Sequence, residues 1–200
     1  MRILVLLVQF SDHVGRQLPP RSHFVDLCND EIAPYLISQS FGRLNVEGCD
    51  VHDWQTVQDT EAVFADGRMG LKSSGEVAKL FEPVLDALDV AGEIDWSAHD
   101  RDNNGKMDIV LAIHSGFAAE QGIGKKCNAP DSLDRVVSQG HMGQNDGWIN
   151  SSGLIQLSSF AVASAFDRVC DETNWASMGV MTHEIIHTFR TLPSAFDHHD

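Results

Sequence analysis

The chain has 200 residues, 42% hydrophobic and 22% charged, and its 14 Lys and Arg against 29 Asp and Glu give a net charge of −15. This composition excludes a disordered or fibrous chain and is typical of a globular domain with a sizeable core. The excess of acidic residues excludes nucleic acid and anionic membrane as partners, because both are negatively charged. No stretch approaches the roughly 20 apolar residues of a membrane span, so we expect none.

In the first half of the chain, the hydrophobic pattern predicts strands around one long helix. Arg2–Phe10 is a short apolar run without a small-residue cleavage site, which favours a buried strand over a signal peptide. Apolar residues at helical spacing predict a helix over His23–Ser38, with Ser22 as its candidate cap and Pro34 as a kink or a division. Leu44–Trp54 is typical of a strand or the edge of a hairpin.

In the second half, the pattern predicts an amphipathic helix over Gly75–Val90 and a final helix over Trp175–Phe189. Between them it predicts three strands, over Met107–His114, Val136–Ser138 and Leu154–Ala163. Segment 115–150 is rich in Gly and polar residues and is expected to be mainly loop. We therefore expect an α/β or α+β fold, in which a mixed sheet is backed by helices.

The most specific motif is His-Glu-Ile-Ile-His at residues 183–187. Spacing of i and i+4 places His183 and His187 one turn apart on one helix face, so both imidazoles can reach one Zn²⁺ ion. Glu184 is rotated by about 100° from His183, which places its carboxylate beside the metal. There it can take a proton from a water molecule that zinc activates. The opposite face of the helix is apolar and is expected to be buried.

A catalytic zinc ion needs a third protein ligand and an open fourth position. The nearest candidates are downstream, at Asp197, His198, His199 and Asp200. The alternative for these residues is a frayed polar tail. Arg190 would share the histidine face of a continuous helix, and its charge would oppose that of zinc, so we expect the helix to end near Phe189.

A second motif predicts a calcium site in the acidic loop before the central strand. Residues 100–108 have the spacing D-x-D-x-N-G-x-x-D, which matches the first nine positions of an EF-hand-type loop. The predicted ligands are Asp100, Asp102, Asn104, the backbone carbonyl of Lys106, and Asp108. Leu111 at the twelfth position excludes a true EF-hand, and the alternative is a solvated polar turn.

Other candidate residues give weaker signals. Cys28, Cys49, Cys127 and Cys170 form no C-x-x-C pair, which argues against a cysteine zinc site and leaves one or two disulfides open. His114 ends a buried strand and is interpreted as a structural histidine. Glu120 is likewise interpreted as a structural residue. His141 and Trp148 are expected on a surface loop, and no motif supports a Ser or Cys nucleophile.

Four segments resemble the immune inhibitor A-like (M6) metallopeptidases, which are secreted zinc proteases. These segments are I-L-V-L-L-V-Q-F-S-D at 3–12, Tyr35–Gly48, Ile94–Gly116 and Met178–His187. The resemblance implies a zincin-like upper subdomain with His183 and His187 as zinc ligands and Glu184 as general base. It also implies calcium in the acidic loop and a secreted protein, although this chain shows no signal peptide. Asp197 matches the last Asp of the family pattern and is our candidate third ligand.

The family pattern changes after the motif. Ile186 replaces a Gly, Arg190-Thr191 stands where one Gly is expected, and Ser194 replaces an Asp. We therefore interpret residues 1–200 as one catalytic domain, incomplete at both ends. The expected function is that of a monomeric zinc endopeptidase acting on proteins or peptides. The alternative is a catalytically inactive, calcium-stabilised binding module of the same fold.

Overall fold

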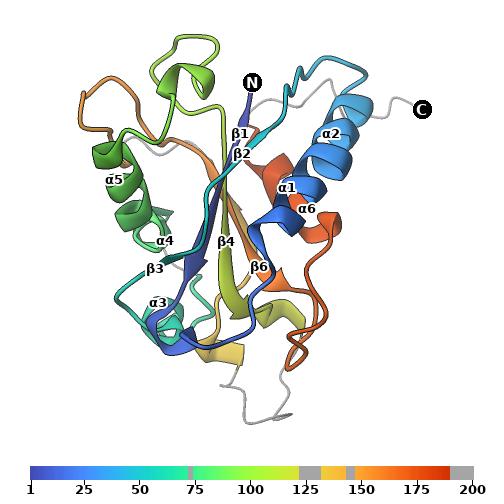
Figure 1. Cartoon of the computed structure of the whole chain (residues 1–200), viewed down its shortest axis with the longest axis vertical. Coiled ribbons are helices and arrows are strands. Elements are labelled where there is room, and N and C mark those ends of the chain that lie inside the picture. Colours follow the sequence, from blue (N-terminus) through green and yellow to red (C-terminus); the bar gives the residue numbers. More distant parts are fainter. Residues whose placement is uncertain (72–73, 122–131, 143–146, 190–200) are drawn as a thin grey trace.

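The computed structural model describes residues 1–71, 74–121, 132–142 and 147–189. It contains one mixed sheet in the order β2-β1-β4-β6-β5, with the short β3 also paired to β1 (Figure 1). The strands are β1 (Ile3–Gln9), β2 (Cys49–Val51), β3 (Gln55–Thr56), β4 (Ile109–Phe117), β5 (Gln139–His141) and β6 (Phe160–Phe166). All pairings are parallel except that of β5 with β6. The prediction of a mixed sheet backed by helices is confirmed.

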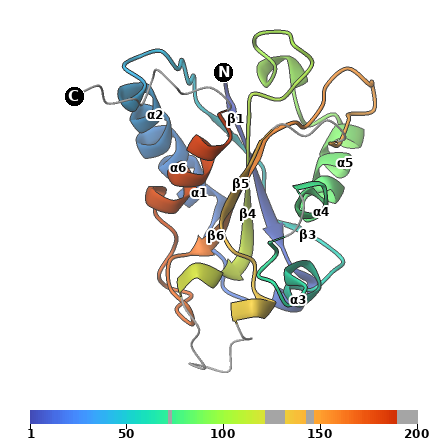
Figure 2. The same cartoon turned by 180° about the vertical axis from the view of Figure 1, so that it is seen from behind.

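Helices cover both faces of the sheet (Figures 1 and 2). They are α1 (Arg21–Asp26), α2 (Ala33–Gln39), α3 (Glu61–Ala65), α4 (Ser74–Ala78), α5 (Glu82–Ala91) and α6 (Met178–His187). One face packs against α1, α2 and α6, and the other packs against α4 and α5. β1 and β4 are therefore buried on both sides, which explains their continuous apolar sequences. No helix in these described ranges is long and apolar enough to cross a membrane.

Proline explains where the predicted helices divide. Segment 21–39 is helical throughout, but a π-helical stretch, Leu27–Ile32, separates α1 from α2, and Pro34 lies in the first turn of α2. Ser22 lies inside α1 and does not cap it, so that prediction was wrong. The single helix predicted over Gly75–Val90 is two helices, and Pro83 occupies the first turn of α5. Proline fits there because a first-turn residue needs no intrahelical N–H bond.

Three strand boundaries also differ from the prediction. β5 begins at Gln139, just after the strand expected over Val136–Ser138, and β2 occupies only three residues of Leu44–Trp54. β6 begins at Phe160 rather than Leu154, because the preceding residues bind the acidic loop instead of the sheet. The N–H of Gln156 donates to the Gly105 carbonyl at 2.8 Å, and its own carbonyl accepts from the Met107 N–H at 3.0 Å.

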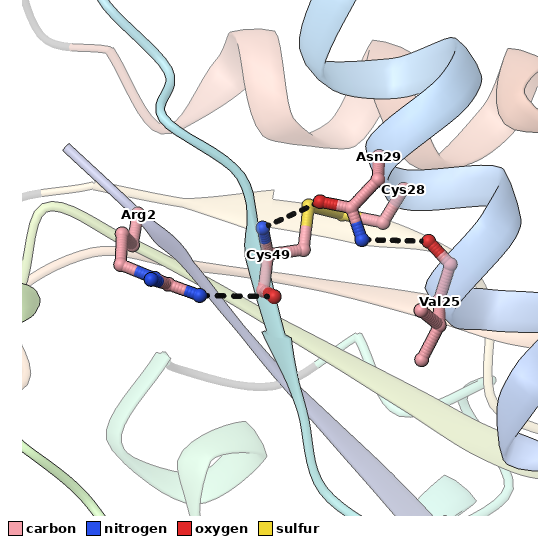
Figure 3. Close-up of a disulfide and its surroundings, with 5 residues drawn as sticks. All are labelled: Arg2, Val25, Cys28, Asn29 and Cys49. Atoms are coloured by element: carbon pink, nitrogen blue, oxygen red, sulfur yellow. Dashed lines mark hydrogen bonds between the residues drawn. A yellow bond between two sulfur atoms is a disulfide. The ribbon is translucent and has the colours of Figure 1, made fainter.

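A disulfide joins the long helical segment to the edge of the sheet. Cys28 in the π-helical stretch is bonded to Cys49, the first residue of β2, with 6.1 Å between their Cα atoms (Figure 3). Asn29 supports the link, since its Oδ1 accepts from the Cys49 N–H at 3.1 Å and its Nδ2 donates to the Val25 carbonyl at 2.9 Å. Cys170 is also disulfide-bonded.

Candidate metal centre

Helix α6 presents the histidine pair on its exposed side. Its opposite side contains Met181 and Ile185, which are 1% and 0% exposed and pack against the sheet, as predicted. Thr188 ends the helix, and its hydroxyl donates to the Ile185 carbonyl at 2.7 Å, which satisfies one of the free carbonyls of the last turn. The helix therefore ends just before Phe189, where the sequence required it to end.

The two imidazoles converge on one point. His183 Nε2 and His187 Nε2 lie 3.0 Å apart, and both rings are exposed. A tetrahedral zinc ion with Zn–N bonds of about 2.0–2.1 Å would hold two nitrogens roughly 3.3 Å apart, so a small ring rotation accommodates it. The histidines also lie in the C-terminal half of α6, where the helix dipole favours a cation. The chemistry and spacing of this pair fit zinc.

Glu184 points away from solvent, toward strand β5. Its side chain is 8% exposed and accepts a hydrogen bond from the backbone N–H of Gly140. Burial raises the pKa of Glu184, and the negative charge of Glu120 acts in the same direction. His183, His187 and the Gly140 N–H partly oppose this shift by favouring the charged carboxylate. The result is a carboxylate with a higher pKa than usual, next to the histidine pair.

Strand β5 lies directly on α6 because Gly140 has no side chain. A Cβ atom at Gly140 would be 2.6 Å from the carbonyl oxygen of Glu184 and 2.6 Å from the Cβ of His187. Both atoms belong to the helix backbone or to the base of a side chain, so neither can move independently of α6. The contact places the antiparallel strand β5 beside the histidine pair and Glu184. The sequence analysis did not identify Gly140, which appeared there only as one of many loop glycines.

The predicted third zinc ligand, Asp197, lies outside the residues that the structure describes. Arg190, Thr191 and Ser194 also lie outside them. Within the described ranges, no group of three or more His, Cys, Asp or Glu side chains converges at metal-binding spacing. The chain matches no protein-family model and no curated protein. The candidate site is therefore defined by the geometry of α6 and β5.

Within the acidic loop, carboxylates of the predicted ligand residues accept hydrogen bonds from backbone N–H groups of the same loop. Asp100 accepts hydrogen bonds at 2.9 Å from the N–H groups of Asn104 and Gly105, and Asp102 accepts a longer one of 3.3 Å from Asn104. Asp108 accepts from the backbone N–H of Arg101, also at 3.3 Å. Burial raises the pKa of Asp108, and the charges of Asp102 and Asp100 add to the effect. In the structure these carboxylates therefore bind backbone N–H groups of the loop, and they do not converge at metal-binding spacing.

A buried polar cluster at the carboxyl ends of β1 and β4 was not predicted. Ser115 Oγ accepts from the Phe10 N–H at 3.0 Å and contacts His13 Nδ1 at 2.9 Å. The other ring nitrogen, His13 Nε2, is 3.4 Å from Glu61 Oε2. Glu61 also accepts from the Val136 N–H at 3.1 Å. Serine, histidine and glutamate are 0%, 5% and 2% exposed, so the chain of contacts is closed to solvent.

Burial keeps this cluster largely uncharged. It raises the pKa of Glu61 to about 8, although the Val136 N–H and Arg16 oppose the shift. Burial and the charge of Arg16 lower the pKa of His13 to about 4. His114, predicted to be structural, is fully buried beside the cluster, and its Nδ1 accepts from the Gly116 N–H at 3.1 Å.

The cluster predicts a loss of stability between pH 6.5 and 8. Glu61 has a higher pKa in the folded state than unfolded, so its contribution is complete below about pH 4.5 and is lost as the pH rises through 8. His13 has the lower folded pKa, so its contribution is complete above about pH 6.5 and is lost as the pH falls through 4. Of these two groups, Glu61 is the one whose contribution changes between pH 6.5 and 8, and through it the free energy of unfolding should fall by about 2 kcal/mol.

Urea unfolding at pH 6.5 and pH 8 measures this fall. In Glu61→Gln the difference between the two pH values should largely disappear, whereas Glu31→Gln, which removes an exposed carboxylate, should keep it. An equal fall in the parent and in Glu61→Gln would contradict the assignment.

The close contact between β5 and α6 predicts opposite changes in the free energy of unfolding for two glycine substitutions. Gly140→Ala should lower the free energy of unfolding by roughly 1–3 kcal/mol, because the new methyl group overlaps α6. Gly179→Ala is the matched control, since a Cβ there meets nothing within 4 Å and alanine favours the helix by about 0.5–1 kcal/mol. Urea unfolding of both variants checks this, and a neutral effect of Gly140→Ala would exclude the close contact.

Proposed function

We propose that the chain is a zinc-dependent endopeptidase whose catalytic centre, of zincin-like arrangement, is formed by α6 and β5. The observation that supports this best is the convergence of His183 Nε2 and His187 Nε2 to 3.0 Å on the exposed face of α6. Without a metal the two rings are within hydrogen-bond distance of each other, and the same two nitrogens are the atoms that would bind a common cation. The resemblance of the motif segments to immune inhibitor A-like peptidases agrees with this proposal.

Each residue near the pair has a defined role in this proposal. A bound zinc ion would lower the pKa of a water molecule and polarise the peptide carbonyl. Glu184 accepts the proton of that water and then delivers it to the leaving amine. Burial raises the pKa of Glu184, and this makes its carboxylate a stronger base than an ordinary glutamate. Asp197 is the proposed third ligand.

Strand β5 is the proposed element that orients the substrate. Within the described ranges its only strand partner is β6, and it runs antiparallel to the rest of the sheet. An extended peptide can pair with the other edge of such a strand through backbone hydrogen bonds. Because Gly140 holds β5 against α6, a peptide in that position would pass the histidines and Glu184. The substrates proposed are accordingly extended segments of proteins or peptides, and the enzyme is proposed to act as a monomer.

We further propose that the acidic loop binds a structural calcium ion and that the protein is secreted. The loop supplies oxygen atoms from Asp100, Asp102, Asn104, Asp108 and the Lys106 carbonyl, which is the donor set that Ca²⁺ prefers. Secretion is supported by the Cys28–Cys49 disulfide, because disulfides persist in oxidising compartments.

Zinc content and hydrolysis together test the proposed activity. The purified chain should bind about one zinc ion, and the double variant His183→Ala/His187→Ala should bind none by atomic absorption. Glu184→Gln should keep its zinc and lose about 10²–10⁴-fold in the rate of cleavage of a fluorogenic peptide library, since only a proton-transfer group is removed. Undiminished zinc in the double variant would refute the metal site. A parent chain that binds zinc and cleaves nothing would be the inactive binding module.

Calcium should stabilise the fold through the acidic loop. An ion that binds only the folded chain adds about 2.7 kcal/mol when its free concentration is 100 times Kd, so the Tm should rise by several degrees. Chelation should reverse the rise, and Asp102→Ala should abolish it, whereas Glu31→Ala should leave it intact. A Tm that is independent of calcium up to the millimolar range would leave the loop as a polar turn.

A further inference from the structure

Residues 136–138, which lead directly into β5, are held by acceptors from three separate parts of the chain. Their successive backbone N–H groups donate to Glu61 Oε1 at 3.1 Å, to the Met69 carbonyl at 2.9 Å and to Glu120 Oε2 at 3.3 Å. The antiparallel ladder with β6 begins only at Gln139. The entry into β5 is therefore fixed by these contacts before the strand joins the sheet.

Glu120 binds Ser138 at two points. Besides the bond from the Ser138 N–H, its Oε1 accepts from the Ser138 hydroxyl at 2.7 Å. The carboxylate lies on a short 3₁₀ helix, Ala119–Gln121, just after β4. Ala118 and Ala119 are each 3% exposed, so this helix is packed against the interior. A two-point contact from a fixed helix restrains both the position and the orientation of Ser138.

The other two contacts do not depend on Glu120. Glu61 is 2% exposed, and a Cβ atom at Gly116 would overlap its Oε1, so the buried carboxylate is closely enclosed. The Met69 N–H also donates to the Leu133 carbonyl at 3.0 Å, which ties the preceding residues to the same loop. Loss of the Glu120 contacts should therefore leave the chain folded and loosen the part of the segment nearest to β5.

Ser138 is close in sequence to the proposed catalytic centre. Gly140 follows it by two residues, which span at most about 7 Å. Gly140 in turn lies against α6 at Glu184 and His187. Because β5 is only three residues long, its own ladder gives it little support. A displacement of Ser138 would consequently move the strand relative to the histidine pair.

We propose that Glu120 is a positioning residue for peptide hydrolysis, which binds Ser138 at two points and so holds β5 where an extended substrate lies beside the histidine pair. The inference rests on the proposed peptidase function, in which β5 pairs with the substrate. Glu120 acts through β5 and does not contact the substrate. Its loss should weaken substrate binding and leave the histidine pair and Glu184 in place.

Hydrogen exchange measures the placement of β5 without requiring activity. The zinc-loaded full chain is compared with Glu120→Ala by mass spectrometry of peptides that cover residues 136–141. The amides of β5 should exchange about tenfold faster in Glu120→Ala, because two hydrogen bonds to a carboxylate are lost, while those of α6 should be unchanged. Glu31→Ala, which removes an exposed carboxylate elsewhere, should match the parent.

Glu120→Gln separates position from charge. The glutamine amide can accept from the Ser138 N–H and donate to its hydroxyl oxygen, so it keeps both contacts without the negative charge, and exchange should stay close to that of the parent. In hydrolysis of a fluorogenic peptide, Glu120→Ala should raise KM about tenfold and change kcat by less than about twofold, and Glu120→Gln should restore KM. The charge of Glu120 also acts on Glu184, so an effect through charge would appear equally in both variants.

Unchanged exchange in Glu120→Ala would overturn the proposal, and so would an equal loss in Glu120→Gln, which would indicate an effect of charge. Faster exchange throughout the chain, or a fall in kcat at constant KM, would also overturn it. A parent chain that hydrolyses no peptide would refute the peptidase, and hydrogen exchange alone would then decide whether Glu120 holds β5 in place. A normal KM in Glu120→Ala would do the reverse, since it refutes the positioning role and leaves the peptidase standing.

Discussion

The pairing of β1 with β4 is the constraint on which the rest of the molecule depends. These two strands are parallel, are buried on both faces and match from Ile3 with Ile109 to Val8 with His114. Since one register aligns both ends, the acidic loop before β4 lies at the amino end of the sheet and the Ser115 cluster lies at the carboxyl end.

The proposed catalytic centre is connected to β1 and β4 through the next two strands of the sheet, β6 and β5. β6 pairs with β4, β5 pairs with β6, and α6 packs on both of these outer strands. The histidines therefore sit on a helix whose back is part of the main core, while their own side remains exposed. Such an arrangement holds the two histidines on a rigid support while their rings remain exposed. It also explains why β5 can be short, because the helix, rather than a long ladder of hydrogen bonds, holds it in place.

The parts of the structure that follow from periodicity could be predicted from the sequence, and those that depend on distant contacts could not. The runs that became β1 and β4 and the two faces of α6 are local patterns, and the structure agrees with them. The spacing of His183 and His187 likewise follows from helix geometry. In contrast, His13 and Glu61 meet only because β1, β3 and β4 come together, and neither belongs to a motif. Gly140 also could not be identified from the sequence, because its role depends on the close contact between β5 and α6.

The Cys28–Cys49 bond has a consequence for how the chain survives among active proteases. β2 is a three-residue edge strand, and such an edge would open locally at little cost. An opened edge strand is an extended peptide, the form that an endopeptidase takes into its cleft. By anchoring β2 to the helical segment beside it, the disulfide keeps that strand in the sheet and so withholds it from proteases. The bond would thus protect the chain from proteolysis as well as stabilise the fold.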